Sequence, residues 1–288
     1  MGSDELDYSD WIGRTEHAED IITVQTTAAM GATLDRDDPL PQEGDPLPPL
    51  WHWMYFTPKV RRSGLGPDGH PERGHFLPPV SLPRRMFAGA SYQFNTPLRL
   101  GATVSRISEI LDVTSKQGRS GPLVFVKVRH VYSMAGEVAF EEIQNIVYRE
   151  AAGASDTPAP EPVEIEDGAW RHSVTADPVT LFRYSALTFN GHRIHYDYPY
   201  ATGVEGYPDL VVHGSLIASN LVELCREKTD DRAIASFYFR AKRPLFANTP
   251  FEITGGLIES GSGFWLKALT TDGTEAMEAG GNFVNKGN

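Results

Sequence analysis

The sequence predicts an α+β protein made of two similar units, each a single helix wrapped by an antiparallel sheet. A small, acidic and proline-bearing stretch at 151–168 divides the chain near its middle, as a linker would. Residues 135–147 and 272–284 align without a gap and share five identical positions. Glycine-bounded runs of alternating or β-branched residues recur in both halves. We therefore expect a first unit at 1–150, a linker at 151–168 and a second unit at 169–288.

Each half is predicted to end in an antiparallel meander. The runs GPLVFVKVRHVYSM at 121–134 and GFWLKALTTDG at 263–273 have the composition of strands, and glycines bound them. Upstream of these runs, the pair Pro97-Leu98 in the first half corresponds to Pro244-Leu245 in the second. A gene duplication explains this correspondence, because two copies of one unit repeat their turns in the same order.

The second unit contains the clearest helix signal, at 214–228. Its apolar side chains recur at helical spacing, its opposite side is small, and basic residues stand at its end, where a helix favours them. In the first half, 22–34 is a candidate helix and the aromatic stretch 50–56 is a second one, with its rings expected in the core. The apolar positions of the 214–228 helix are Leu216, Ile217, Leu221, Leu224 and Cys225.

Composition excludes several classes of protein. The formal charge is -12 with dispersed basic residues, which disfavours nucleic acid as a partner. No run of roughly 18 apolar residues exists to span a membrane, and the acidic start resembles no targeting segment. The single cysteine, Cys225, precludes an internal disulfide and fits the cytoplasm. We expect a cytoplasmic protein without a membrane or nucleic-acid partner.

Two histidine-bearing segments raise the question of a metal. His195, Asp197 and His213 have the residue types of a two-histidine, one-carboxylate iron site, but the short, turn-containing separation disfavours that arrangement. His70 and His75 lie in a segment that is expected to be a loop. We therefore expect no metal. Nucleophile-elbow and phosphate-loop patterns are also missing from the sequence.

Acid/base chemistry remains for the segment TFNGHRIHYD at 188–197. If 193–197 is extended, His195 and Asp197 share one face, and Asn190 lies in a turn that can fold back toward His195. An amide and an imidazole can hold one water, and histidine exchanges protons near neutral pH. Gly214 opens the predicted helix, so its amide can polarise a carbonyl oxygen. This combination suits proton abstraction next to a thioester, or water addition across its double bond.

The stretch at 184–216 resembles the hydratase signature of the MaoC-like (R)-specific enoyl-CoA hydratases, which have a hotdog fold. The resemblance implies a double hotdog, and it implies catalytic roles for Asn190, His195 and Gly214. One departure matters, because Asn190 stands where the family has an aspartate. The motif TFNGHRIHYD, together with GHFLPPVSLPRRMFAG at 74–89, resembles the motifs of a narrower group. That group contains the itaconyl-CoA and mesaconyl-C4-CoA hydratases and the mitochondrial 3-hydroxyacyl-thioester dehydratases.

The resemblance implies an acyl-CoA substrate that is hydrated without a further cofactor, with citramalyl-CoA as the product of the dicarboxylic members. A second carboxylate on the substrate needs a cation, and coenzyme A phosphates need others. A dehydratase of fatty-acid metabolism, a hotdog thioesterase and a non-catalytic acyl-CoA-binding protein stay open, as does a homodimer. The residues expected to bind substrate are Arg84, Arg85, Arg193, His213, Arg240, Lys242 and Arg243.

Overall fold

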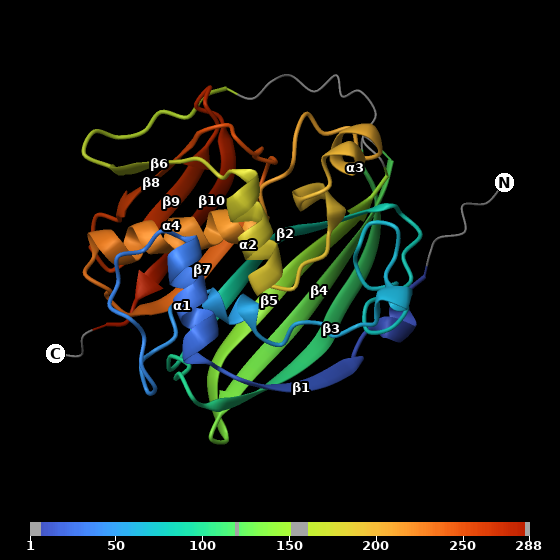
Figure 1. Cartoon of the computed structure of the whole chain (residues 1–288), viewed down its shortest axis with the longest axis horizontal. Coiled ribbons are helices and arrows are strands. Elements are labelled where there is room, and N and C mark those ends of the chain that lie inside the picture. Colours follow the sequence, from blue (N-terminus) through green and yellow to red (C-terminus); the bar gives the residue numbers. More distant parts are fainter. Residues whose placement is uncertain (1–6, 119–120, 151–160, 286–288) are drawn as a thin grey trace.

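The computed structural model describes residues 7–118, 121–150 and 161–285, and these form one ten-stranded sheet with helices on one face (Figure 1). The strand order is β1-β3-β4-β5-β2-β7-β10-β9-β8-β6, and every neighbouring pair is antiparallel. The strands are β1 (Thr15–Ile21), β2 (Arg84–Phe94), β3 (Thr103–Gly118), β4 (Gly121–Met134), β5 (Glu137–Arg149), β6 (Trp170–Val174), β7 (Ile234–Ala241), β8 (Phe251–Leu257), β9 (Gly263–Leu269) and β10 (Glu275–Phe283).

The two halves of the sheet repeat one topology. From the outer edge inward, the first half runs β1, β3, β4, β5, β2 and the second runs β6, β8, β9, β10, β7. The halves join where β2 pairs with β7, with Ser91 opposite Tyr238. Gly136 in the β4–β5 turn and Gly273 in the β9–β10 turn, which the sequence aligned, both have a positive φ, at 85° and 78°. The shared turn conformation and strand order support the predicted duplication.

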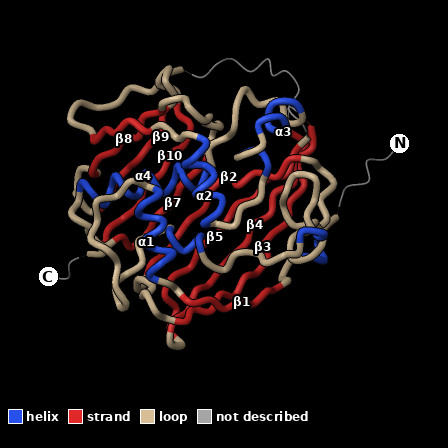
Figure 2. Tube along the Cα trace, in the orientation of Figure 1, coloured by secondary structure: helices blue, strands red, loops and turns tan. Residues whose placement is uncertain are grey.

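The helices are α1 (Val24–Thr33), α2 (Pro178–Leu187), α3 (Tyr198–Gly203) and α4 (Gly214–Lys228), and they cover one face of the sheet (Figure 2). Four 3-10 helices accompany them: η1 (Ser9–Trp11), η2 (Trp51–Met54), η3 (Arg62–Gly64) and η4 (Arg193–His195). The predicted helices at 22–34 and 214–228 are therefore confirmed as α1 and α4. Among the described residues, no helix is both long and apolar enough to cross a bilayer.

Helix α4 is wrapped by its half of the sheet and contacts β8, β9 and β10. Leu216, Leu221 and Cys225 on α4 are almost completely buried, as the spacing predicted. Between its first and second strands the first half has α1 and the short η2 and η3, and η2 lies where the sequence suggested an aromatic helix. Trp51 of η2 is buried and donates a hydrogen bond from Nε1 to Glu223 of α4, at 2.9 Å. The expectation that these aromatic side chains belong to the core is confirmed for Trp51.

The connection between the halves lies only partly within the described residues. Of the expected linker at 151–168, residues 151–160 lie outside the described part of the chain. In the remaining portion, Val163 donates its backbone N–H to the carbonyl of Gly273, at 3.0 Å. That hydrogen bond attaches the connection to the β9–β10 turn shortly before β6 begins.

Candidate functional site

A cavity of about 1150 Å³ opens on the helical face of the sheet, and residues from both halves line it. The first half contributes His70 from the loop before β2 and Arg85 from β2 itself. The second half contributes Asn190, from the segment after α2, and Ser215, from the first turn of α4. The segments in which the sequence predicted catalytic or substrate-binding residues therefore line the same cavity.

The segment that contains Asn190 is folded into turns. The prediction that 193–197 is extended is wrong, because Arg193 begins the 3-10 helix η4 and the Asp197 N–H donates to its carbonyl at 2.8 Å. Two side chains stabilise this turn. Asn190 Oδ1 accepts the backbone N–H of His192 at 3.0 Å, and Asp197 caps α3 by accepting the N–H of Tyr200 at 3.2 Å. Side-chain hydrogen bonds of this kind compete with an extended backbone.

His195, which ends η4, is buried with 7% of its surface exposed. Its Nδ1 lies 2.7 Å from the carbonyl oxygen of Val211, so Nδ1 carries the proton of the neutral ring and Nε2 keeps a lone pair. Burial lowers the pKa of His195 to about 4, so the ring is neutral at neutral pH. His195 does not itself form the cavity wall, which Asn190 and Ser215 form beside it.

His213 and Gly214 connect this imidazole to the start of α4. The ring of His213 stacks on that of His195 with centroids 3.6 Å apart, and its Nε2 lies 2.8 Å from Ser185 Oγ. His213 is the N-cap residue and Gly214 the first residue of α4. Within the described chain the Gly214 N–H has no backbone acceptor, as expected for the first amides of a helix. The positive end of α4 therefore lies beside the cavity, next to Ser215.

Two further histidines extend this pair of rings into a row. His192 lies 5.5 Å from His195, and His70 lies 4.2 Å from His192, measured between ring centroids. Burial is the main cause that lowers the pKa of His192 to about 2 and that of His70 to about 4. The imidazoles of this row are therefore neutral at neutral pH, so they can act as proton acceptors.

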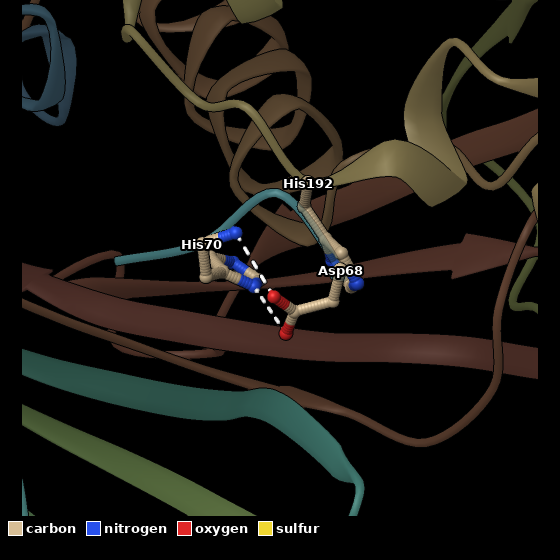
Figure 3. A group of neighbouring side chains, drawn as sticks. All are labelled: Asp68, His70 and His192. Atoms are coloured by element: carbon tan, nitrogen blue, oxygen red, sulfur yellow. Dashed lines mark hydrogen bonds and ion pairs between the residues drawn. The ribbon is translucent and has the colours of Figure 1, made fainter. Parts of the chain in front are cut away.

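Asp68 belongs to the same group, and the sequence analysis missed its part in the site (Figure 3). Asp68, His70 and His192 each bring one potential ligand atom within 4.8 Å of the others. Such a set could hold a divalent cation. The iron arrangement considered for His195 does not form, because Asp197 is hydrogen-bonded to Arg193 instead. The polar loop at 68–75 could be identified in the sequence, but its partner, His192, lies more than a hundred positions later in the chain.

The three arginines expected near the substrate carboxylate have different surroundings. Arg84 is buried and forms an ion pair with Glu205, Nε to Oε2, at 3.0 Å. Arg193 forms an ion pair with Asp197 at 2.7 Å and stacks over an aromatic ring. Arg85 lines the cavity and has no ion-pair partner among the residues that the structure describes. Arg85 alone of these three can offer its charge to a ligand in the cavity.

The second set of basic residues lies away from the cavity. Arg240 is exposed on β7, on the face opposite the buried side chain of Phe239. Lys242 forms ion pairs with Glu275 and Glu278, and Arg243 is exposed in the following loop. None of these three basic residues is among the described residues that line the cavity.

Comparison with known proteins places this site in a family. The family model described as hydroxyacyl-thioester dehydratase type 2 matches residues 50–247. The mesaconyl-C(4)-CoA hydratase of Chloroflexus aurantiacus is 48% identical over 275 residues, which cover 95% of this chain and 96% of that protein. Both matches span the loop before β2 and the start of α4, the two elements that face each other across the cavity.

Solved structures agree on the fold. The HtdX protein of Mycobacterium tuberculosis gives a TM-score of 0.67 at 17% identity, covering 94% of this chain and 100% of that one. A second Mycobacterium tuberculosis protein, described as a double hotdog fold, gives a TM-score of 0.59 at 9% identity, covering 95% and 96%. These likenesses confirm the predicted double hotdog. The family model, which matches more than half of the chain, shows that the chain belongs to the hydroxyacyl-thioester dehydratase type 2 family.

Proposed function

We propose that this chain is a hydro-lyase that adds water across the double bond of an α,β-unsaturated acyl-CoA thioester with a second carboxylate. Mesaconyl-C4-CoA would be hydrated to citramalyl-CoA in this way, and itaconyl-CoA would give the same product by addition across its β,γ double bond. The proposal rests mainly on one observation: the start of a helix and an arginine without a carboxylate partner among the described residues line one cavity, and the neutral imidazole of His195 is buried beside its wall. The 48% identity to a mesaconyl-C(4)-CoA hydratase supports the same chemistry.

The chemistry follows from the atoms around the cavity. His195 takes one proton from a water that Asn190 orients, and the water oxygen bonds to the β-carbon. The electrons of the double bond move toward the thioester oxygen, where the Gly214 amide at the start of α4 stabilises the negative charge. His195 then returns a proton to the α-carbon. The thioester is itself the substrate, so this reaction needs no further cofactor.

Arg85 is proposed to bind the second carboxylate. It lines the cavity without an ion pair among the described residues, while Arg84 and Arg193 are already engaged by Glu205 and Asp197. A guanidinium bound to a carboxylate contributes about 1.5 to 3 kcal/mol. Replacing Arg85 with glutamine should therefore lower kcat/KM for a dicarboxylic substrate about tenfold to a hundredfold. For crotonyl-CoA, which has no second carboxylate, the same change should have little effect.

The test is a substrate panel with a mass readout. The purified protein is incubated with mesaconyl-C4-CoA, itaconyl-CoA and crotonyl-CoA, and the gain of one water is followed. We expect the dicarboxylic esters to be preferred, and we expect Arg85→Gln to remove that preference. Turnover of crotonyl-CoA together with inactivity toward both dicarboxylic esters would refute the assignment and favour a dehydratase of plain hydroxyacyl thioesters, the activity named by the family description.

Two controls distinguish the alternative functions. A hotdog thioesterase would release free coenzyme A, which a thiol-reactive dye detects, whereas a hydratase releases none. A non-catalytic binding protein would shift the melting temperature with acyl-CoA but yield no product. A homodimer and a cytoplasmic location stay predictions from the sequence; the buried free thiol of Cys225 is compatible with a reducing compartment.

A further inference from the structure

One wall of the cavity is formed by the sheet of the first half. In the second half, helix α4 packs against β8, β9 and β10 (Figure 1). The corresponding strands of the first half are β3, β4 and β5. These strands face the cavity instead, and each contributes a polar side chain to its lining, namely Ser108, His130 and Gln144. The function proposed above gives these side chains no role.

The three polar residues are neighbours on one face of the sheet. Ser108 is paired with His130 across β3 and β4, and His130 is paired with Glu142 across β4 and β5. Gln144 follows Glu142 by two positions, so both side chains lie on the same face of β5. Arg85 is paired with residue 148, four positions farther along β5, which separates Gln144 from the level of Arg85 by about 13 Å. The polar group is therefore distinct from the proposed carboxylate site at Arg85.

Two of these side chains are accessible from the cavity, and a buried partner fixes each of them. His130 is 8% exposed, and its Nδ1 lies 2.8 Å from Oγ of the fully buried Ser108. Gln144 is half-buried and donates from Nε2 to Oε1 of the fully buried Glu142, at 2.9 Å. An imidazole has a second ring nitrogen, and a primary amide has a second N–H and a carbonyl oxygen. Both side chains therefore keep hydrogen-bonding groups for a ligand.

The surroundings of His130 and Gln144 favour an uncharged ligand group. Burial is the largest cause that lowers the pKa of His130 to about 4, so its ring is neutral at neutral pH. Arg106, the preceding residue on the same face of β3, already forms an ion pair with Glu16 at 3.2 Å. A ligand carboxylate beside Gln144 would meet the buried carboxylate of Glu142. A hydroxyl or an amide would instead exchange hydrogen bonds without the cost of placing a second negative charge there.

We propose that His130 and Gln144 form a subsite for an uncharged hydroxyl or amide group of the acyl-CoA, remote from its thioester, and that Ser108 and Glu142 position them. The inference rests on the function proposed above, because that function places an acyl-CoA in this cavity. Two parts of such a ligand can supply the group: a hydroxyl on the acyl chain, or the amides and hydroxyl of the pantetheine arm. An apolar group at the subsite would leave the imidazole and the amide without partners, so it should bind less tightly.

The test measures Kd by isothermal titration calorimetry for hexanoyl-CoA, 6-hydroxyhexanoyl-CoA and S-hexanoyl-N-acetylcysteamine, saturated thioesters that cannot be hydrated. Ser108→Ala combined with His130→Leu removes the imidazole together with its hydroxyl partner, so that no buried polar group loses its partner. We expect this change to raise Kd about threefold to tenfold for a ligand that uses the subsite. Gln144→Met retains the side-chain length, loses the amide and should have a similar effect. The matched control is Ser105→Ala with His17→Leu, on the opposite face of β3 and β1, and it should leave Kd unchanged.

The three ligands identify the group that binds. If it is the acyl hydroxyl, the unaltered protein binds 6-hydroxyhexanoyl-CoA more tightly than hexanoyl-CoA, and the variants remove this difference. If it is the pantetheine arm, the variants weaken both CoA esters equally but not S-hexanoyl-N-acetylcysteamine, which lacks most of that arm. Folded variants that bind every ligand within about twofold of the unaltered protein would overturn the inference, as would an unaltered protein that binds none of them.

Binding and turnover separate this inference from the proposed function. Hydration of mesaconyl-C4-CoA by the unaltered protein is measured in parallel. If hydration is absent but the variants weaken the binding of the saturated esters, only the proposed reaction fails. If hydration occurs but the variants leave binding unchanged, only the subsite fails. Should the double variant not fold, Gln144→Met decides by the same criteria.

Discussion

Replacing Gly214 with proline removes the amide proton at the start of α4 from the proposed site and adds a pyrrolidine ring. The first helical position tolerates proline, because the N–H there has no partner within the helix. The structure meets the further requirement that the preceding residue be extended, since His213 has φ -59° and ψ 129°. The Gly214 N–H has no backbone acceptor among the described residues. The fold should therefore survive the substitution.

The catalytic loss can be estimated from the same geometry. If the Gly214 N–H stabilises the developing negative charge on the thioester oxygen, its removal costs about 2.7 to 4 kcal/mol of activation free energy. That corresponds to a kcat about a hundredfold to a thousandfold lower. Gly214→Ala is the matched control, because it retains the N–H, and a Cβ at this position meets no atom within 4 Å. The alanine variant should keep most of the activity.

The measurement is steady-state hydration of mesaconyl-C4-CoA, with urea unfolding to compare stability. The reasoning predicts a large loss of kcat for Gly214→Pro, a small one for Gly214→Ala, and similar unfolding midpoints for both. A proline variant that is folded and turns over within fivefold of the unaltered protein would refute a role for this amide. The helix end would then be structural.

Three further results are expected. Asn190→Ala should lower kcat about a hundredfold if Asn190 orients the water; a twofold change would make the residue structural. Glu142→Leu should lower the free energy of unfolding by about 3 to 5 kcal/mol, because this fully buried carboxylate accepts hydrogen bonds from His52, Trp53, Tyr92, Tyr132 and Gln144. Denaturant titration measures this, and Glu141→Gln on the opposite face of β5 should change it little. Stability should also decline as pH falls from about 6.5 toward 4, since burial holds the folded-state pKa of His195 at about 4 against 6.5 when unfolded. The unfolded chain then binds more protons than the native state, and melting temperatures that stay flat through this window would contradict the prediction.

The first half of the chain shows how duplication changes a site. The second half places the start of α4 at the cavity, whereas the first half forms only the short η2 from its aromatic stretch. It contributes Arg85 from its sheet and the Asp68 loop instead. The sequence analysis found the hydratase motif at 184–216, in the second half. It also expected Arg84 and Arg85 of the first half to bind substrate, but it did not anticipate that Asp68 would join the site.

The sequence by itself determined two units of helix and antiparallel sheet and the two main helices, because these depend on local information, namely periodicity and glycine turns. The double hotdog and the hydratase motif came from the resemblance of residues 184–216 to a known family. Only the tertiary structure decided that 193–197 is a turn. The side chains of Asn190 and Asp197 stabilise it by accepting hydrogen bonds from neighbouring backbone N–H groups. The tertiary structure also placed Arg85 at the cavity without an ion-pair partner among the described residues and brought His70 to His192. Contacts between loops so far apart in the chain depend on how the two halves of the sheet join, which local patterns do not specify.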